Sequence, residues 1–458
     1  MSLLRSTYRV CYLVLVSILR RIRGQRLGRL PLSNASVELA DIKTAIRMIM
    51  RRHQTNEGSY IKQYEDLFAR YVGVSHAYSF LGGRVSLSAI LEALEFGEGD
   101  EIIIPAFNCV VVPNALLYRG IKPIYADIDL ETFNILPEEI ERVITPRTRG
   151  LIIQHIFGMV ADLEPILAAA KRHGLIVIED CAHALGAEYR DRKVGTFGEA
   201  AFFSTEQSKV ISTQMGGMAV TDSDIIGEKL RNIQSRSAFP SQEEIRQRLW
   251  QFIGNYCYTR PHFNEVLGTV YSEIIKPMVR AKEIQSTTDT EMCSVRPHDY
   301  GKRLPDAMAA LGIRQLEKVE EYNKRRVKSA MAYAELLTTI GAKTIAARKN
   351  TKPVFLRYPL YVRDKKRFRD LAQQIGIEPG VWFTEVMHPV GAKLDKVGYK
   401  RGQCPNAEFA VENVVNLPTG YNIDSKLIAN LGMLREIVIP DEKFEAFRNG
   451  RKADKALV

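Results

Sequence analysis

The chain has 458 residues, of which 46% are hydrophobic, 26% charged and 9% aromatic. This composition is typical of a folded globular protein and excludes a disordered or fibrous one, and the length favours two or more compact units. Seven of the eleven excess positive charges are arginines that precede the first acid, Glu38, so the rest of the chain lacks the strongly basic surface expected of a nucleic-acid-binding protein.

Residues 1–30 form a basic N-terminal segment with an apolar run, Val10 to Leu19, that is interrupted only by Ser17. A helix of that length rises only ~15 Å, half the hydrocarbon thickness of a bilayer, so it cannot span a membrane. Three interpretations stay open. The segment is a peripheral contact with an anionic membrane surface, a signal or transit peptide without an obvious cleavage site, or a helix packed on the protein or its dimer partner.

From about residue 60 to 235, short apolar segments alternate with helical ones, which predicts an α/β domain with a largely parallel sheet sandwiched by helices. The predicted strands are Glu101–Ile104, Pro123–Ala126, Gly150–His155, Leu175–Ile178, Ala200–Ser204 and Gly217–Thr221. The predicted helices are Val85–Phe96, Val110–Tyr118, Pro137–Ile144, Leu163–His173 and Asp224–Ile233.

Residues 236–298 interrupt this alternation with a mostly helical insertion. We therefore place a large domain at 31–300 and a smaller α+β domain at 301–458. The smaller domain follows a long predicted helix, Asp306–Leu337. Its remaining predicted elements are Val354–Val362, Phe368–Ile375 and Asn406–Asn416.

Three polar residues follow strand ends in the stretch 176–220. Asp180 follows the strand Ile176–Ile178, Ser204 ends the next strand, and Lys209 comes five residues later. Ligands bind beyond the carboxyl ends of strands in an open α/β sheet, so we expect the three side chains to converge in one crevice. A lysine amine forms a Schiff base with an aldehyde cofactor, and a carboxylate keeps a pyridine nitrogen protonated.

The sequence around these residues resembles the DegT/StrS family of sugar aminotransferases, which depend on pyridoxal 5'-phosphate (PLP). The resemblance lies in the runs Ile178 to Ala187, Val194 to Gly198 and Phe203 to Lys209, followed by Gly216-Gly217, and it extends over roughly residues 60–235 and 300–420. It implies the fold of PLP-dependent transferases of fold type I.

The resemblance also implies roles for individual residues. Lys209 carries the cofactor and moves the proton, Asp180 holds the ring nitrogen, and His183 contacts the side of the phenolic oxygen. Gly83 and Arg84, at a helix start, bind the phosphate together with Ser204. Residues that line the sugar pocket are Trp382 and His388, with Phe383 beside them.

Two single positions and one three-residue motif depart from the family pattern. Cys109 stands where many members have an aromatic residue that stacks on the cofactor, and Met215 stands where the family has an acid. The family's Asn-Tyr-Arg motif, which reaches the partner subunit's cofactor phosphate, is Gly301-Lys302-Arg303 here. Compensation by Arg84 or Lys302 is a hypothesis.

The resemblance implies transfer of an amino group, with glutamate as the expected donor, to a nucleotide-linked keto-deoxysugar used in amino-sugar or polysaccharide biosynthesis. It also implies a homodimer. Six scattered cysteines without metal-ligand spacing favour a cytoplasmic protein without a metal site. The alternatives are a PLP enzyme acting on a non-sugar ketone and a catalytically silent scaffold. Lys209 argues against the related dehydratases, which have histidine at that position.

Overall fold

The computed structural model describes residues 12, 29–33, 35–51, 56–259, 264–280 and 285–445. The predicted basic segment 1–30 lies outside this range, apart from Tyr12, Arg29 and Leu30. No helix among the described residues is long and apolar enough to cross a membrane.

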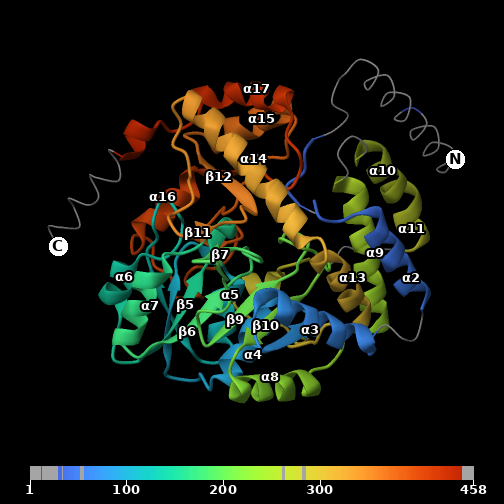
Figure 1. Ribbon diagram of the computed structural model, residues 1–458, viewed down its shortest axis with the longest axis vertical. Coiled ribbons are helices and arrows are strands. Elements are labelled where there is room, and N and C mark those ends of the chain that lie inside the picture. The colour runs from blue at the N-terminus through green and yellow to red at the C-terminus, as the bar shows by residue number, and fades with distance from the viewer. Residues whose placement is uncertain are drawn as a thin grey trace.

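A seven-stranded sheet forms the centre of the molecule, with the strand order β1-β10-β9-β6-β5-β2-β4 (Figure 1). Only β10 runs antiparallel to its neighbours, so the predicted α/β fold with a largely parallel sheet is confirmed. The strands are β1 His76–Phe80, β2 Glu101–Pro105, β4 Lys122–Ala126, β5 Thr148–Gln154, β6 Ile176–Asp180, β9 Ala200–Ser204 and β10 Gly217–Thr221. β1 was not among the predicted strands.

Helices cover both faces of this sheet, and the side chains of each strand alternate between two cores. In β2, Ile102 and Ile104 belong to one hydrophobic cluster and Ile103 to the other. The first cluster includes side chains of α4 (Gly83–Ala93) and α5 (Val111–Leu117). The second includes side chains of α3 Ser59–Val72, α6 Pro137–Val143, α7 Leu163–Arg172 and α13 Asp306–Leu316. Burial on both faces explains why β2, β9 and β10 are mainly apolar.

The predicted helix from Asp306 to Leu337 is wrong in one respect, because the chain forms two helices there, α13 and α14 (Val319–Thr339). Between them, Lys318 donates hydrogen bonds to Asp41 Oδ2 at 2.7 Å and to the carbonyl of Ser36 at 2.9 Å. Asp41 lies on α2 (Leu39–Met50). This tie to α2 holds the turn, so α13 stays packed on the large domain while α14 turns toward the C-terminal elements.

The C-terminal elements lie above the sheet in Figure 1 and include an antiparallel pair, β12 (Arg357–Tyr361) with β14 (Val414–Pro418). A second pair is parallel: β13 (Met387–His388) joins β3 (Asn108–Cys109) and brings the C-terminal part to the sheet's edge. Other elements are β7 Glu188–Tyr189, β8 Arg192–Lys193, β11 Thr351–Lys352, α15 Lys365–Ile375, α16 Pro405–Asn413 and α17 Ser425–Leu431. The exact domain limits stay a prediction.

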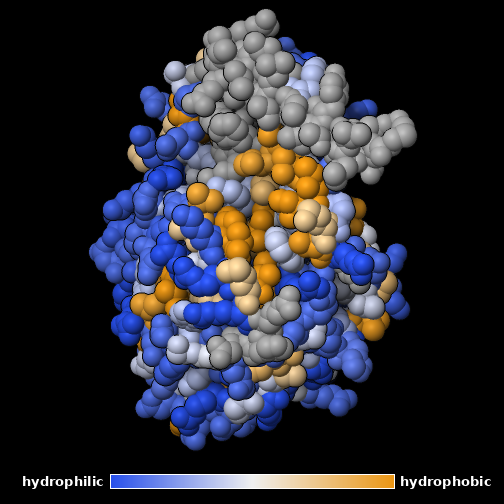
Figure 2. Space-filling model, turned by 90° about the vertical axis from the view of Figure 1, so that its right-hand side faces the viewer, coloured by the Kyte–Doolittle hydropathy of each residue, from blue (hydrophilic) through white to orange (hydrophobic). Residues whose placement is uncertain are grey.

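The inserted segment begins after α8 (Asp224–Arg236) and is helical in α9 (Gln242–Thr259), α10 (Asn264–Val270) and α12 (Asp289–Met292). A π-helical turn, Tyr271–Ile275, and the short α11, Lys276–Met278, follow α10. Figure 2 shows apolar side chains gathered on the face formed by α2 and the inserted helices. Exposed members of this group are Leu39, Ile46, Met50, Tyr258 and Met278.

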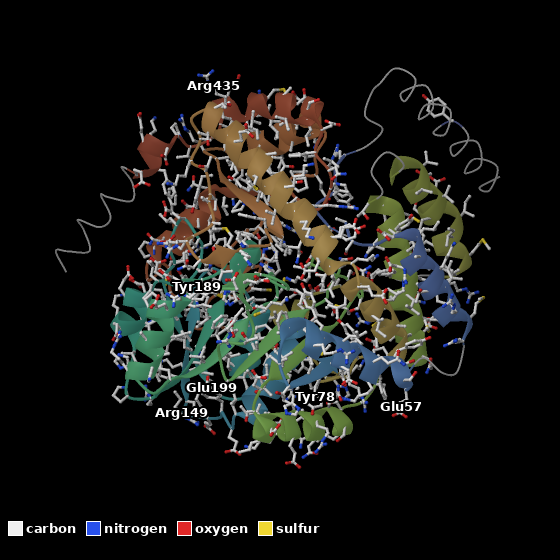
Figure 3. The ribbon with its side chains drawn as sticks, viewed as in Figure 1. Glu57, Tyr78, Arg149, Tyr189, Glu199 and Arg435 are labelled. Atoms are coloured by element: carbon white, nitrogen blue, oxygen red, sulfur yellow. The ribbon has the colours of Figure 1, made fainter. Side chains whose placement is uncertain are left out.

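The direction of the parallel strands places the carboxyl ends toward the middle of the molecule. Arg149 and Glu199, at the amino ends of β5 and β9, lie toward the lower edge in Figure 3. The opposite ends of the same strands therefore face the C-terminal elements, where a crevice between the two parts is expected.

Candidate active site

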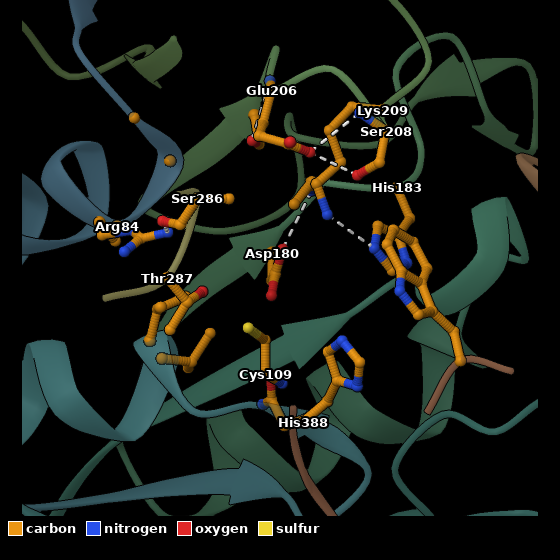
Figure 4. A pocket seen from close by; sticks show the side chains of 18 of the residues that line it. Arg84, Cys109, Asp180, His183, Glu206, Ser208, Lys209, Ser286, Thr287 and His388 are labelled. Carbon is orange, nitrogen blue, oxygen red and sulfur yellow. Dashed lines mark hydrogen bonds between the residues drawn. The ribbon is translucent and has the colours of Figure 1, made fainter. Parts of the chain in front are cut away.

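A pocket lies at the carboxyl ends of β6 and β9, closed on one side by the C-terminal elements. All nine residues that the sequence predicted for cofactor and substrate line it. They are Gly83, Arg84, Cys109, Asp180, His183, Ser204, Lys209, Trp382 and His388. Figure 4 shows the Lys209 amine pointing into the centre of the pocket, between Asp180 and His183. Their individual roles stay predictions.

Lys209 has its amine 3.0 Å from Nε2 of His183. Burial lowers the pKa of the Lys209 ammonium, and the negative charge of Glu206 opposes this only in part. Burial and the nearby Lys209 charge also lower the pKa of His183 well below its usual range, so the imidazole is neutral. His183 Nδ1 accepts a hydrogen bond from the backbone N–H of Phe157 at 3.2 Å, which leaves the ring proton on Nε2. A ring N–H that faces Lys209 favours the neutral amine, the nucleophilic form.

Asp180, the last residue of β6, is buried on the floor of the pocket. Burial raises the pKa of its carboxyl to about 6, although the N–H of Ala182 and the charge of Lys209 favour the carboxylate. One carboxylate oxygen accepts the Ala182 N–H at 3.0 Å. A carboxylate held this way is stabilised further by any cationic ligand that enters the pocket.

The amino end of α4 forms a second wall, where Gly82, Gly83 and Arg84 meet Ser204 at the end of β9. A Cβ atom at Gly83 would lie 3.1 Å from Cβ of Ser204 and 3.3 Å from the carbonyl of Phe203, so any side chain here would crowd β9. The first N–H groups of a helix have no partner within the helix and attract anions. This wall is therefore suited to a phosphate.

The guanidinium of Arg84 forms an ion pair with Glu291 and donates to the carbonyl of Ser286 at 2.6 Å. Both side chains are nearly buried, with 14% and 4% of their surface exposed. Burial alone would lower the pKa of Arg84, but the carboxylate of Glu291 outweighs it and the pKa is raised. The sequence predicted that Arg84 binds a phosphate. In the structure, its positive charge is already paired with Glu291, which lies in the insertion.

The segment 285–300 of the insertion covers this side of the pocket and adds Ser286 and Thr287 to its lining. It is attached to α5 by two further hydrogen bonds. Asn114 donates to the carbonyl of Glu291 at 2.7 Å, and Tyr118 donates to the carbonyl of Val295 at 3.0 Å. The insertion, whose role the sequence did not reveal, therefore builds one wall of the site.

Trp382 and His388 form the aromatic side of the pocket. The Trp382 ring is stacked on His183, with centroids 5.3 Å apart and an interplanar angle of 8°. His388 is stacked on Phe383, and Oγ1 of Thr384 lies 3.1 Å from its Nδ1. Burial and the charge of Arg357 lower the pKa of His388 to about 3. Both rings are neutral surfaces suited to a sugar or a cofactor ring.

Positions that depart from the family pattern are divided between the pocket and its surroundings. The sulfur of Cys109 points into the cavity in Figure 4, and Met215 also lines it. Lys302 does not line it, because its amine pairs with Glu244 at 2.7 Å and Asp299 at 2.8 Å. Within this chain, the Lys302 amine therefore forms ion pairs outside the pocket.

Sequence reasoning missed Gln154, Ser286, Thr287 and Glu291. Gln154 ends β5, lines the pocket, and has a buried Oε1 without a hydrogen-bond partner. Its place at a strand end, like that of Asp180, was a signal that could have identified it. The other three lie in the insertion, where no motif pointed to them.

His155, Glu179 and Cys181 form a buried group that could in principle hold a metal ion. The Nδ1 of His155 accepts the Ala161 N–H, and its Nε2 lies 3.2 Å from Glu179. Glu179 also accepts the N–H groups of Gly195, Phe197 and Gly198. These bonds already use the donor atoms of His155 and Glu179, which favours a structural role for His155.

The chain was also compared with proteins of known sequence and structure. The chain is 32% identical over 364 residues to an uncharacterized protein of Methanocaldococcus jannaschii, covering 78% of this chain and 84% of that one. It is 27% identical over 394 residues to UDP-N-acetyl-3-dehydro-alpha-D-glucosamine 3-aminotransferase of Acidithiobacillus ferrooxidans, covering 85% and 92%.

The fold is similar to that of GDP-4-keto-6-deoxy-D-mannose-3-dehydratase of Escherichia coli, solved with bound hydrated PLP. The TM-score is 0.68 at 20% identity, over 90% of this chain and 99% of that one. The family model of the DegT/DnrJ/EryC1/StrS aminotransferases matches residues 37–257 and 273–432, which confirms the resemblance found in the sequence. The chain belongs to the DegT/DnrJ/EryC1/StrS aminotransferase family.

Proposed function

We propose that the pocket binds PLP, covalently through Lys209, and that the protein transfers an amino group to a nucleotide-linked keto sugar. The observation that carries the proposal is the convergence of Lys209, Asp180 and the α4 amino end in one pocket. The donor set fits the cofactor: an amine for an aldehyde, a buried carboxylate for a ring nitrogen, and helix N–H groups for a phosphate. The unpartnered Oε1 of Gln154 leaves one further buried polar atom for a ligand.

When bound, PLP supplies an aldehyde that accepts the amino group and a ring that takes up electrons. Lys209, whose ammonium pKa is lowered by burial, takes the proton from the donor's Cα and returns it, a step typically worth ~10²–10⁴ in rate. Asp180 keeps the ring nitrogen protonated. Trp382 and the segment 285–300 restrict the entry of water on two sides.

The substrate proposal is supported by family membership and by the relative named as an aminotransferase of a UDP-linked dehydro sugar. Glutamate, the proposed donor, would leave as 2-oxoglutarate while the keto carbon of the sugar gains the amine. Lys209 supports transamination over the dehydration named for the E. coli neighbour, because the resemblance links dehydration to histidine at this position.

The test is a panel of keto sugar nucleotides that differ in nucleotide and in keto position, incubated with glutamate while 2-oxoglutarate is measured. We expect turnover with at least one member and none with the corresponding non-keto sugars. Turnover confined to ketones without a nucleotide would contradict the sugar proposal, and the absence of any turnover or bound PLP would contradict the enzymatic one.

We also propose that the protein acts as a cytoplasmic homodimer in amino-sugar or polysaccharide biosynthesis, and that residues 1–30 make a peripheral contact with an anionic membrane. Five described cysteines are free thiols, in keeping with a reducing compartment. The arginines that flank the run Val10 to Leu19 support the membrane contact.

A further inference from the structure

The outer side of α2 carries an apolar stripe. Leu39, Ile46 and Met50 are seven and four residues apart, so they lie on one face of the helix. All three are exposed, Met50 to 70%, and none belongs to a hydrophobic cluster of the described residues. The inner face of α2 packs against α9 and α13 and fixes the helix in the fold. The outer stripe is therefore available for a contact outside this chain.

A row of cations runs beside the apolar stripe. Lys43, Arg47 and Arg51 are exposed and four residues apart, and none of them forms an ion pair with another described residue. Like charges at this spacing repel one another along the surface of a helix. The single acid of α2, Asp41, lies on the inner face and is paired with Lys318. The row of cations is therefore unfavourable in the isolated protein and becomes favourable against an anionic partner.

The inserted helices continue this apolar surface (Figure 2). Tyr258, in the last turn of α9, packs edge-on against Tyr271, with the ring centroids 5.7 Å apart. Tyr271 also belongs to the cluster that buries the inner face of α2. Met278 in α11 is 79% exposed, and Lys276 and Arg280 lie on either side of it in the sequence. The insertion thus repeats the combination of apolar and basic side chains found on α2.

The charge of this surface limits what can cover it. Among the described side chains of α2 and of residues 264–280, the acids are Asp41, which is buried, and Glu273, which is only partly exposed. A second copy placed about a twofold axis through the surface would bring like cations together. Residues 1–28 offer six arginines and no acid, and a nucleic acid offers no apolar surface for Met50. A bilayer with anionic headgroups matches both the cations and the apolar stripe.

We propose that the exposed side of α2, together with Tyr258 and Met278, docks onto an anionic phospholipid bilayer, and we call this surface the bilayer face. Its apolar side chains enter the boundary between headgroups and acyl chains, and its cations lie among the headgroups. The contact is built from folded elements, so it is distinct from the one proposed for residues 1–30. Two contacts on one chain strengthen each other, because binding of one raises the local concentration of the other. The inference does not depend on PLP or on the sugar substrate.

The experiment compares the full-length protein with two double variants of the bilayer face. Lys43→Gln with Arg47→Gln removes two cations, and Ile46→Gln with Met50→Gln removes two apolar side chains. Co-sedimentation with vesicles of phosphatidylcholine, with and without phosphatidylserine, gives the partition coefficient of each protein. A photoactivatable phosphatidylserine, followed by peptide mapping, identifies the residues in contact with lipid.

Matched controls lie on the exposed sides of helices outside the bilayer face. Lys366→Gln with Arg369→Gln removes two exposed cations of α15, which has no exposed large apolar residue among its described side chains. Met331→Gln removes an apolar side chain of α14 that is 67% exposed. These controls separate docking by the bilayer face from a general effect of surface charge or hydrophobicity.

For Lys43→Gln with Arg47→Gln we expect the partition coefficient on phosphatidylserine vesicles to fall ~10–30-fold, since each cation near an anionic surface contributes about a fivefold factor. The variant without the two apolar side chains should lose about tenfold. The controls should change by less than about twofold, and the lipid should label peptides that contain Met50 or Met278. Without vesicles, the melting temperature of the charge variant should equal or exceed that of the unaltered protein, because repulsion along α2 is relieved.

Equal losses in the face variants and in the controls would overturn the inference, as would lipid label confined to residues 1–28. Failure of the unaltered protein to bind phosphatidylserine vesicles would also overturn it. A changed particle mass of the face variants in the absence of vesicles, with unchanged vesicle binding, would assign the surface to a contact between copies of the chain instead.

Discussion

The reactivity of the site depends on the burial of Lys209 and on the neutral ring of His183 beside it. His183 is held neutral by burial and by the N–H of Phe157, and its remaining ring proton faces the amine at 3.0 Å. Asp180 is the carboxyl that the ligand would stabilise. Before any ligand enters, the pocket therefore holds a lysine whose pKa is lowered and a carboxyl whose pKa is raised.

Asp180→Asn tests the second of these groups. Because a neutral amide cannot hold a ring nitrogen protonated, we expect PLP to bind while proton abstraction slows by at least ~10²-fold. The measurement is the single-turnover rate with glutamate. A rate within threefold of the unaltered protein would contradict the role of Asp180.

The raised pKa of Asp180 also predicts how the free energy of unfolding depends on pH. The folded-state pKa of Asp180 is raised to about 6, so the empty protein binds a proton more tightly than the unfolded chain and loses stability as the pH rises through the window from about 4 to 6. We expect urea titrations of the PLP-free protein to show a slope in this window that is reduced in Asp180→Asn. An identical pH profile would refute the raised pKa.

For single residues, the sequence predicted the pocket correctly where the functional side chains lie at the carboxyl ends of strands. Asp180 and Ser204 end strands that are neighbours in the sheet, and Lys209 follows within a short loop, so local pattern brought them together. Glu291 is 207 positions from Arg84, and only the folded insertion brings the two into contact.

Among the elements, the segment 285–300 is the one that the sequence left without a role. Its capping box, in which Thr288 and Glu291 exchange hydrogen bonds at the start of α12, orients the Glu291 carboxylate toward Arg84. The ion pair thus links the insertion to the α4 amino end, the proposed phosphate wall.

Glu291→Gln leaves Arg84 buried without its counter-ion. We expect a loss of ~3 kcal/mol in unfolding free energy and weaker retention of PLP, because breaking one side of a buried pair is costly. Equilibrium unfolding and the dissociation rate of PLP are the measurements.

The matched control is the double variant Arg84→Met with Glu291→Met, which removes both charges. Recovery of most of the lost stability, without recovery of PLP retention, is the expected result. Full stability in the single variant would show that the pair does not hold the segment in place.

Helix prediction failed where a tertiary contact decided the outcome. The apolar spacing from Asp306 to Leu337 is continuous, but Lys318 is tied to Asp41 and Ser36, which lie more than 270 positions earlier. The strand β1 is as long as most of its neighbours, but it was missed because His76 and Ser79 interrupt its apolar pattern. Local propensity describes an element, whereas such contacts decide where it ends.

The described residues form two cores on the faces of one sheet and a third apolar cluster between α2, α9 and α13. An apolar outer face lies over α2 and the inserted helices (Figure 2). The largely parallel sheet followed from the alternation of apolar segments along the chain, whereas the family fold followed from the resemblance of the motifs between Ile178 and Gly217. The apolar outer face was not predicted, because helical spacing alone does not reveal which side of a helix stays uncovered.

Deleting residues 1–28 tests the proposed membrane contact. We expect the shortened protein to keep its activity and to lose most of its co-sedimentation with vesicles rich in phosphatidylserine, with neutral vesicles as the control. Equal sedimentation of both proteins would favour a helix packed on the protein or on a second subunit. Light scattering on the unaltered protein without vesicles should give twice the 51.8 kDa chain mass if the homodimer proposal holds.

The central claim, that Lys209 carries the cofactor, is tested most directly by peptide mapping after borohydride reduction of the protein with PLP. We expect one modified peptide, with the pyridoxyl group on Lys209, and a Lys209→Ala variant that is colourless, unmodified and without transamination. Label on a different lysine, or turnover that survives in Lys209→Ala, would contradict the account.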